Sequence, residues 1–509
     1  MFIVFSLLFL RDPFTFEIIG DKKILSQKLD HFDSHSNETF NQIYYENRNY
    51  GGGNPKSIVI YLGSENIPDV QFNFSAMLLA EQTHSILYSL EHRFFGESFP
   101  DLQLETSNLQ QYLTTRQVLN DIAYFINHIR NEVKCQNREC NITLVGGGYL
   151  GTLAAWFRIK YPHFAASVIS SSSPMLINKT YPAFDSNVYD VYNERKPDCA
   201  NLFYVLEYLY NLQDVEKFKE KFEFNQEQTA ESFYYVVSEV VSLPMLYRRH
   251  FNLTGQICDQ IMPSDIDSLA SAFRIINNRF ETTPQSLDPY SYKGSSLDSQ
   301  YRNHRSWTWL KCSEIGLWHT ASKDSKIKHP SVNETYFNNV CKTLFGRDLT
   351  VLDSIEYGNS DYTATNAVFI NGNLDPYKNA SLQFNNTGYH RSVYIIEGGF
   401  HCDDMLPYSN DNASIAREAA VHDIIEWGNQ KQNPRKCENG IPIFGSCKCY
   451  KNFGGDDCEY KTHPQQSFKI ITYLAVLVPT ILLLIIGSAV WLCGKREESE
   501  IGARPTLYT

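Results

Sequence analysis

Residues 143–174 read T-L-V-G-G-G-Y-L-G-T-L-A-A-W-F-R-I-K-Y-P-H-F-A-A-S-V-I-S-S-S-S-P, and this stretch decides the fold. A short β-prone run at 142–145 enters a glycine cluster, and a helical pattern begins near Thr152. A strand, a tight turn and a helix in this order are typical of the elbow that presents a nucleophile above a sheet. The tip of this turn is Gly148, which has no side chain.

This elbow closely resembles that of the serine carboxypeptidases of the lysosomal prolyl-carboxypeptidase type, which include dipeptidyl peptidase II and thymus-specific serine protease. That family shows G-G-S-Y-x-G before an A-A-W-F-R-x-K-Y-P helix, and this chain reads G-G-G-Y-L-G before L-A-A-W-F-R-I-K-Y-P. The resemblance implies an α/β-hydrolase fold and a serine exopeptidase ancestry, with cleavage of Pro-containing peptides. It also implies that Gly148 replaces the nucleophilic serine and that the N–H of Tyr149 would help to bind the oxyanion.

The two other members of a catalytic triad follow strands in the same family context. A strand at 367–370 leads into N-G-N-L-D-P-Y, which resembles the family's N-G-x-x-D-P-W and makes Asp375 the candidate acid. A second strand at 392–396 leads into E-G-G-F-H-C-D-D-M, which makes His401 the candidate base. The order nucleophile, acid and base is that of the α/β-hydrolases. The resemblance therefore implies a triad from which the attacking oxygen is missing.

Without a side-chain oxygen at residue 148, no acyl-enzyme can form there. Loss of a triad serine typically lowers turnover by about 10⁶, whereas binding groups remain. Glycine accepts the strained, positive φ of an elbow without a steric penalty, so the fold should survive. We therefore predict a catalytically impaired, peptide-binding pseudopeptidase. The alternative is an active serine-type carboxypeptidase or dipeptidyl peptidase, either through another nucleophile or because glycine at 148 is an error in the sequence.

The first third of the chain also follows the family. The segment Q-K-L-D-H-F-D at 27–33 resembles its entry segment, and apolar runs at 56–62 and 85–90 have the length of strands. The E-H-R-F-F-G-E-S segment at 91–98 fits either buried ion pairs that support the sheet or contact with substrate. Apolar residues from Val118 to Ile129 recur at helical spacing and predict an amphipathic helix on the sheet.

One departure from the family lies after the strand at 56–62. The family usually shows G-G-E-G there, and this chain has Gly63, Ser64, Glu65 and Asn66. A glycine-rich turn can bring backbone close to a substrate. The resemblance makes Glu65 a candidate substrate-binding residue, in a turn that has lost two glycines.

Between residues 176 and 345 the apolar residues fall into helical patterns, without the alternation of strands. This texture resembles the helical insertion that caps the active site in the family. Within it, W-T-W-L-K-C-S-E-I-G at 307–316 is similar to the family's W-x-Y-Q-x-C-x-E-x-G. Trp307 and Trp309 are therefore candidates either for a substrate pocket or for packing in the core.

The ends of the chain predict export and a membrane anchor. Residues 1–18 contain a short apolar run typical of a signal peptide, and residues 470–493 carry no charge and precede Lys495 and Arg496. This pattern predicts a single-pass type I protein whose ectodomain is extracellular or in the lysosomal or endosomal lumen, with a cytoplasmic tail at 494–509. Acceptors for N-glycosylation all precede the predicted span, at Asn37, Asn73, Asn141, Asn178, Asn252, Asn333, Asn379, Asn385 and Asn412.

The chain has 12 cysteines, and four of them crowd next to the predicted span. Cys437, Cys447, Cys449 and Cys458 resemble the C-terminal half of an EGF-like module and are candidates for two disulfides. A zinc site is the rival interpretation of C-x-C, but no histidine completes it. Cys493 lies at the end of the span, so an odd number remains in the main part and at least one is not paired within it. A thiol nucleophile at Cys402 is disfavoured, because adjacent side chains on an extended loop point apart.

Composition sets the outer limits of function. The apolar fraction of 43% supports a large core, and the net charge of -12 argues against nucleic acid as a partner. No metal or organic cofactor is implied, peptides are the expected ligands, and a homodimer is one of the assemblies that the sequence allows.

The predicted order of domains is an α/β-hydrolase domain in two parts, 25–175 and 346–432, around a helical cap at 176–345. An EGF-like segment at 437–458 and the transmembrane helix follow.

Overall fold

The structure is a computed structural model, and it describes most of the chain up to residue 430. The described ranges are 20–51, 56–63, 74–135, 140–195, 199–212, 214–225, 227–246, 251–297, 301–357, 362–385, 390–406 and 411–430, with four short strands after residue 439. The chain divides into two compact units, 1–432 and 433–509. Each unit is described by itself.

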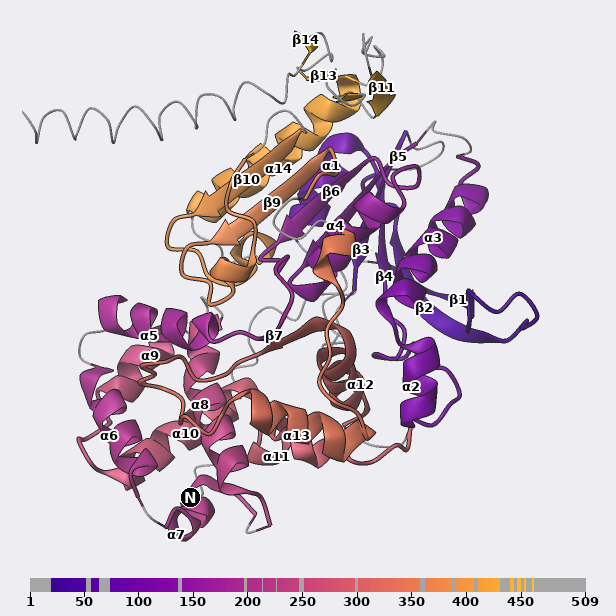
Figure 1. The fold of residues 1–509 in the computed structure, drawn as a ribbon. Coiled ribbons are helices and arrows are strands. Elements are labelled where there is room, and N and C mark those ends of the chain that lie inside the picture. Colours follow the sequence, from indigo (N-terminus) through magenta and orange to yellow (C-terminus); the bar gives the residue numbers. More distant parts are fainter. Residues whose placement is uncertain are drawn as a thin grey trace, which may run out of the picture. The chain divides into compact units, whose positions relative to one another are not determined.

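An eight-stranded mixed sheet forms the centre of the first unit (Figure 1). Its strand order is β1-β2-β4-β3-β5-β6-β9-β10, in which β2 pairs antiparallel with β1 and β4 and all other neighbours are parallel. The bounds are β1 Asp21–Lys28, β2 Thr39–Asn47, β3 Ser57–Leu62, β4 Ile86–Leu90, β5 Asn141–Gly147, β6 Ser167–Ser171, β9 Ala367–Gly372 and β10 Arg391–Ile396. This topology confirms the predicted α/β-hydrolase-like fold, and the strands expected from the sequence all form.

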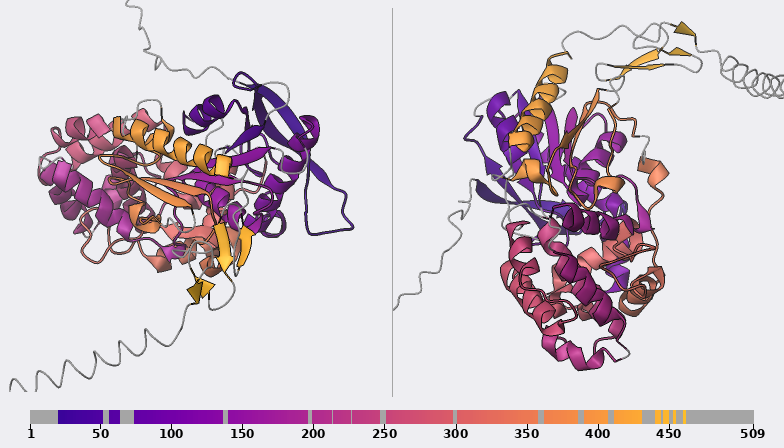
Figure 2. Two further views of the ribbon diagram at one scale, coloured as in Figure 1. Left: turned by 90° about the horizontal axis from the view of Figure 1, so that it is seen from above. Right: turned by 90° about the vertical axis from the view of Figure 1, so that its left-hand side faces the viewer.

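Helices cover both faces of this sheet, as Figure 2 shows. They are α1 Phe74–Thr83, α3 Thr115–Glu132, α4 Tyr149–Lys160 and α14 Asp411–Gln430, and the short helix α2 Thr106–Tyr112 precedes α3 in the sequence. Successive side chains of a strand point to opposite faces. Val59 and Val145 therefore pack in one buried cluster with α1 and α14, whereas Ile60 and Leu144 pack in another with α3 and α4. Burial of each such side chain contributes roughly 1.5 to 3 kcal/mol relative to exposure.

Arg93, within the segment 91–98, supports the sheet through buried hydrogen bonds. The Arg93 guanidinium is fully buried and binds both carboxylate oxygens of Asp121 on α3, at 2.5 and 2.6 Å. It also donates to backbone carbonyls, among them those of Leu29 and Tyr112. A buried guanidinium with this many acceptors is satisfied within the fold, which favours the structural interpretation of E-H-R.

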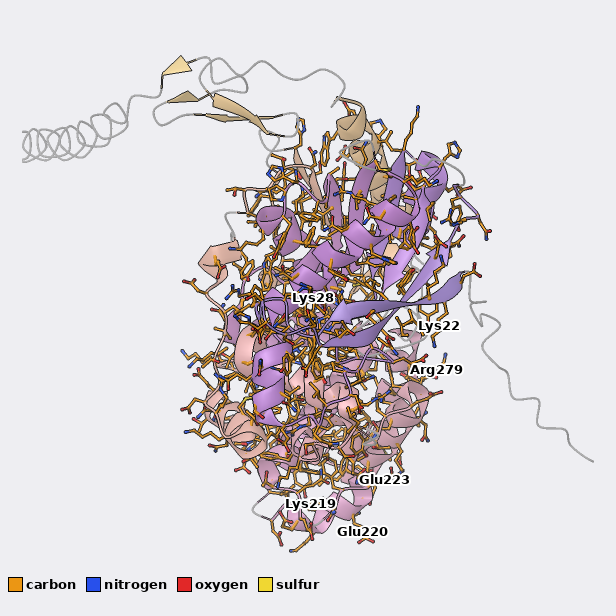
Figure 3. All side chains as sticks on the ribbon, turned by 90° about the vertical axis from the view of Figure 1, so that its right-hand side faces the viewer. Lys22, Lys28, Lys219, Glu220, Glu223 and Arg279 are labelled. Carbon is orange, nitrogen blue, oxygen red and sulfur yellow. A yellow bond between two sulfur atoms is a disulfide. The ribbon has the colours of Figure 1, made fainter. Side chains whose placement is uncertain are left out.

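The outer edge of the sheet is polar. Lys22 and Lys28 lie on the edge strand β1 and are labelled in Figure 3. Both residues are exposed, and Lys22 pairs with Glu97. Lysines on an edge strand oppose pairing with the strands of other molecules.

A group of helices lies at one end of the sheet and inserts between β6 and β9 in the sequence (Figure 1). Its helices are α5 Ala183–Arg195, α6 Ala200–Tyr210, α7 Glu216–Lys219, α8 Ala230–Leu246, α9 Phe251–Cys258, α10 Ile266–Phe280, α11 Pro284–Leu287, α12 Arg302–Leu310 and α13 Glu334–Phe345. Two short parallel strands, β7 Asn178–Thr180 and β8 Gly316–Trp318, accompany them. The helical pattern that the sequence predicts for this region is present.

Disulfides hold three pairs of cysteines in the first unit. They join Cys135 to Cys140, Cys199 to Cys258 and Cys312 to Cys341. Cys402 is free and partly buried. The predicted odd cysteine of the main part is therefore Cys402.

The second unit contributes two strand pairs, β11 Gly440–Ile443 with β12 Ser446–Cys449 and β13 Phe453–Gly454 with β14 Tyr460–Lys461. Cys447 and Cys449 lie on β12, whereas Cys437 and Cys458 fall outside the described residues. None of the described helices is both long and apolar enough to cross a bilayer. The predicted signal peptide at 1–18 and the predicted span at 470–493 lie outside the described residues, so both stay predictions.

Candidate active site

The elbow forms at Gly148, the single residue between β5 and α4. Its φ of 55° and ψ of -130° lie in a region that residues other than glycine rarely occupy. The N–H of Gly148 donates to the Ser171 carbonyl at 2.9 Å, and its carbonyl accepts from the Thr152 N–H at 3.1 Å. These bonds tie the tip of the turn to β6 and to the first turn of the helix.

The candidate acid and base meet above the ends of β9 and β10. Nδ1 of His401 lies 3.0 and 3.2 Å from the two carboxylate oxygens of Asp375, which is fully buried. Asp375 also accepts from the N–H of Tyr377 at 2.8 Å, and the N–H of His401 donates to the Leu246 carbonyl of α8 at 3.2 Å. The imidazole is thus held in one orientation, with Nδ1 toward the carboxylate.

The free end of the imidazole points to the elbow. A Cβ atom built on Gly148 would lie 3.4 Å from Nε2 and 3.9 Å from Cε1 of His401, and apart from its chain neighbours no other described residue comes within 4 Å of it. A hydroxyl on that carbon would be within hydrogen-bonding reach of Nε2. The structure therefore brings Gly148, Asp375 and His401 together, and their role as the positions of a triad stays a prediction.

Two neighbouring groups raise the pKa of the His401 imidazole. Burial disfavours the charged imidazolium, but the Cys402 sulfur and the Asp375 carboxylate outweigh it and raise the pKa of His401 well above 6.5. The side chain of His401 is 16% exposed, so solvent still reaches it. His401 and Asp375 are therefore electrostatically coupled.

A cavity of about 210 Å³ opens beside the elbow. Gly148, Tyr149 and His401 line it from the sheet side, and the helical group contributes the opposite wall. Trp307 of α12 is part of this wall, and its ring lies 5.4 Å from that of Tyr149. Trp307 therefore lies where a pocket residue would lie, and its contact with a substrate stays a prediction.

Trp309 packs in the core, which is the second of the two roles that the sequence allowed. Its side chain is buried, its indole N–H donates to the Leu113 carbonyl at 2.9 Å, and its ring packs against Phe345. Trp309 does not line the cavity and belongs to the core. Glu65 lies outside the described residues and stays a prediction.

A second polar cluster lines the same cavity, and the sequence did not reveal it. Nδ1 of His319 lies 3.0 Å from the Glu239 carboxylate, and its Nε2 lies 2.7 Å from the Tyr377 hydroxyl. Lys328 donates to Glu239 at 2.6 Å. Burial alone would raise the pKa of Glu239, but the Lys328 ammonium and His319 lower it. Burial lowers the pKa of His319 to about 4, so this imidazole is neutral at physiological pH.

Most of the chain matches a known protein family. The family model for serine carboxypeptidase S28 matches residues 27–421. The chain belongs to the serine carboxypeptidase S28 family. Human lysosomal Pro-X carboxypeptidase is 26% identical over 438 residues, which cover 79% of this chain and 87% of the relative. A Caenorhabditis elegans protein assigned as a serine protease is 28% identical over 478 residues, which cover 82% and 87%. The bovine Pro-X carboxypeptidase is 25% identical over 449 residues, covering 80% and 87%.

Membership in the S28 family confirms the resemblance that implies the site residues.

The structure describes most of the predicted glycosylation acceptors. Exposed positions are occupied by Asn37, Asn178, Asn333, Asn379, Asn385 and Asn412, and Asn141 is partly exposed at the start of β5. The side chains of Asn73 and Asn252 are not among those described. Modification at these acceptors stays a prediction.

The coupling between His401 and Asp375 gives a first prediction. In Asp375→Asn the negative charge is lost while burial of the imidazole remains, so the pKa of His401 should fall below that of the unmodified chain. The imidazole Cε1–H resonance, assigned with His401→Ala, reports this pKa by NMR titration. Asp348→Asn is the matched control, because Asp348 pairs on the surface with Lys342 and should leave the resonance unchanged. An unaltered pKa in Asp375→Asn would show that the carboxylate does not face the imidazole in solution.

Proposed function

We propose that this member of the S28 family is a membrane-anchored pseudopeptidase that binds peptides beside a disarmed triad. The observation that carries the proposal is the 3.4 Å separation between His401 Nε2 and the place of a Cβ on Gly148. In an active site of this kind the serine Oγ passes its proton to Nε2 while it attacks the carbonyl. Gly148 offers no atom that could form the covalent bond, so the acyl-enzyme route is closed.

Neighbouring hydroxyls do not replace the missing oxygen. Ser170 donates to the Gly151 carbonyl, Ser171 to the Asp404 carboxylate, and Thr152 to the Pro174 carbonyl. All three are buried, and none of them lines the cavity. The Cys402 sulfur interacts with His401 but does not line the cavity, and it would contact a Cβ built on Gly147 at 3.0 Å. These positions support binding over turnover.

The lining of the cavity supports peptide binding. The cavity keeps the orienting acid and base, aromatic walls at Trp307 and Tyr377, and the elbow backbone at Tyr149. Tyr149 begins α4, and N–H groups in the first turn of a helix favour negative charge. Relatives named Pro-X carboxypeptidase motivate Pro-containing peptides as the ligand class. The apolar segments at the chain ends and the name "lysosomal" in these relatives motivate a luminal or extracellular ectodomain.

The proposal is tested on the glycosylated chain, purified in detergent, with acetyl-Ala-Pro-Phe as the probe. We expect saturable binding by calorimetry and no release of phenylalanine over many hours. Fast release that a serine-directed phosphonate blocks would support the alternative, an active serine exopeptidase. The absence of any binding by this peptide and by its amide would overturn the proposed ligand class.

A further inference from the structure

Lys311 is a buried lysine in the cavity wall that the triad does not use. It begins a π-helical turn, Lys311–Ile315, directly after α12. Turns of this kind occur frequently at functional sites. The residue is 8% exposed, and its ammonium lies 4.0 Å from the centroid of the Trp318 ring. Within the ranges that the structure describes, Lys311 makes no salt bridge.

The nearby carboxylate is already neutralised. Glu239 binds the Lys328 ammonium at 2.6 Å and contacts His319 at 3.0 Å. Lys328 is itself 1% exposed and also donates to the Ser238 hydroxyl, so it is directed at Glu239. The negative charge of Glu239 and the positive charge of Lys328 cancel, and His319 is neutral. This wall of the cavity therefore carries one uncompensated positive charge, that of Lys311.

A buried ammonium without an anion is costly, since desolvation disfavours its charged form. The pKa of Lys311 reflects this: burial lowers it to about 8, with Glu239 raising it and Lys328 lowering it. A ligand that brings a negative charge would supply the missing partner, and charge-assisted hydrogen bonds in a dry site are the strong ones. The surroundings of Lys311 therefore favour an anion as its partner.

We propose that Lys311 binds the carboxylate of a peptide that occupies the cavity. This inference rests on the proposed function, because it assumes that the cavity beside Gly148 takes peptides. About 210 Å³ is the space of roughly seven waters, at about 30 Å³ each, which is enough for one terminal residue. Tyr235, Trp307 and Tyr377 give this space aromatic walls, so an amino-acid side chain fits beside the charge.

The carboxylate could come from the C-terminus of the peptide or from an Asp or Glu side chain. Binding to the purified chain is measured by calorimetry with four probes: acetyl-Ala-Pro-Phe as free acid and as amide, and the amides of acetyl-Ala-Pro-Glu and acetyl-Ala-Pro-Gln. We expect at least one carboxylate peptide to bind tenfold or more tightly than its neutral counterpart. Preference for the free acid identifies the C-terminus, and preference for Glu over Gln identifies a side chain.

Lys311→Met should abolish that preference, so that the acid and neutral forms bind within about twofold of each other. Lys28→Met is the matched control: it removes the same charge from the exposed edge strand β1 (Figure 3) and should retain the preference. Thermal unfolding of both variants reports whether each is folded. If Lys311→Met does not fold, equal binding of acid and neutral peptides by the unmodified chain still overturns the inference, and Lys311→Gln is the second variant in which the preference should be lost.

The outcomes separate the inference from the function on which it rests. If none of the four peptides binds, the proposed peptide-binding function is wrong. If acid and neutral forms bind equally well to the unmodified chain, peptide binding stands and the role of Lys311 is overturned. A preference that persists in Lys311→Met would also overturn it.

Discussion

Replacing Gly148 with serine is expected to convert the chain into a peptidase, with a turnover at least 10³-fold above that of the unmodified protein. Loss of a triad serine typically lowers turnover by about 10⁶, and the acid and base here are already aligned, with Nδ1 of His401 at 3.0 Å from Asp375. The added Cβ would lie 3.4 Å from Nε2, in ordinary contact distance. Release of phenylalanine from acetyl-Ala-Pro-Phe, measured by chromatography, gives the rate.

Two variants control for this gain. Gly148→Ala introduces the same Cβ at a φ of 55° without a hydroxyl, so it should carry the same strain, roughly 1 to 3 kcal/mol, and remain inactive. Combining Gly148→Ser with His401→Ala should remove the activity again. A Gly148→Ser chain that is folded, binds the peptide and still does not cleave it would contradict the view that only the attacking oxygen is missing.

The second large effect concerns stability: Lys328→Met is expected to lower the free energy of unfolding by roughly 3 to 5 kcal/mol. Breaking a buried ion pair by removing one partner leaves an uncompensated charge. The side chain of Lys328 is fully buried and that of Glu239 is 15% exposed, so water cannot readily replace the ammonium. Urea unfolding followed by tryptophan fluorescence measures the loss.

The surface pair between Lys221 and Asp267 provides the control. Its side chains are 41% and 70% exposed, and such pairs contribute about 0 to 1 kcal/mol. Lys221→Met should therefore be nearly neutral, and adding Glu239→Gln to Lys328→Met should recover part of the stability. If Lys328→Met is no worse than Lys221→Met, the Glu239 cluster does not carry a buried charge.

Local sequence patterns predicted the elements that hold the triad. The apolar runs that became β3, β5 and β9 are largely buried, as expected of strands covered on both faces, whereas β10 is an edge strand on which Ile395 is exposed. Asp375 and His401, which follow β9 and β10, lie where these parallel strands end. Thr114 caps α3 by accepting a hydrogen bond from the Gln117 N–H. The helix therefore begins at Thr115, just before Val118, where the apolar periodicity starts. These features depend on residues close together in the sequence.

The cavity wall could not be predicted in this way. Glu239, Lys311, His319 and Lys328 come from separate segments of the helical group, and only tertiary packing brings them together. Trp307 and Trp309 are two positions apart on α12, so they face different sides of the helix, one the cavity and the other the core. The sequence motif alone did not show which of the two tryptophans faces the cavity. A lysine inside an aromatic motif, as in W-T-W-L-K-C, is the signal that could have drawn attention to Lys311.

Active-site labelling tests the central claim most directly. The native chain and Gly148→Ser are treated with a fluorophosphonate, which forms a covalent bond with an activated serine, and the adducts are located by mass spectrometry. We predict no adduct on the unmodified chain and an adduct at residue 148 in Gly148→Ser, which His401→Ala should prevent. Stoichiometric labelling of the unmodified chain at any residue would contradict the claim, because another nucleophile would then serve the surviving acid and base.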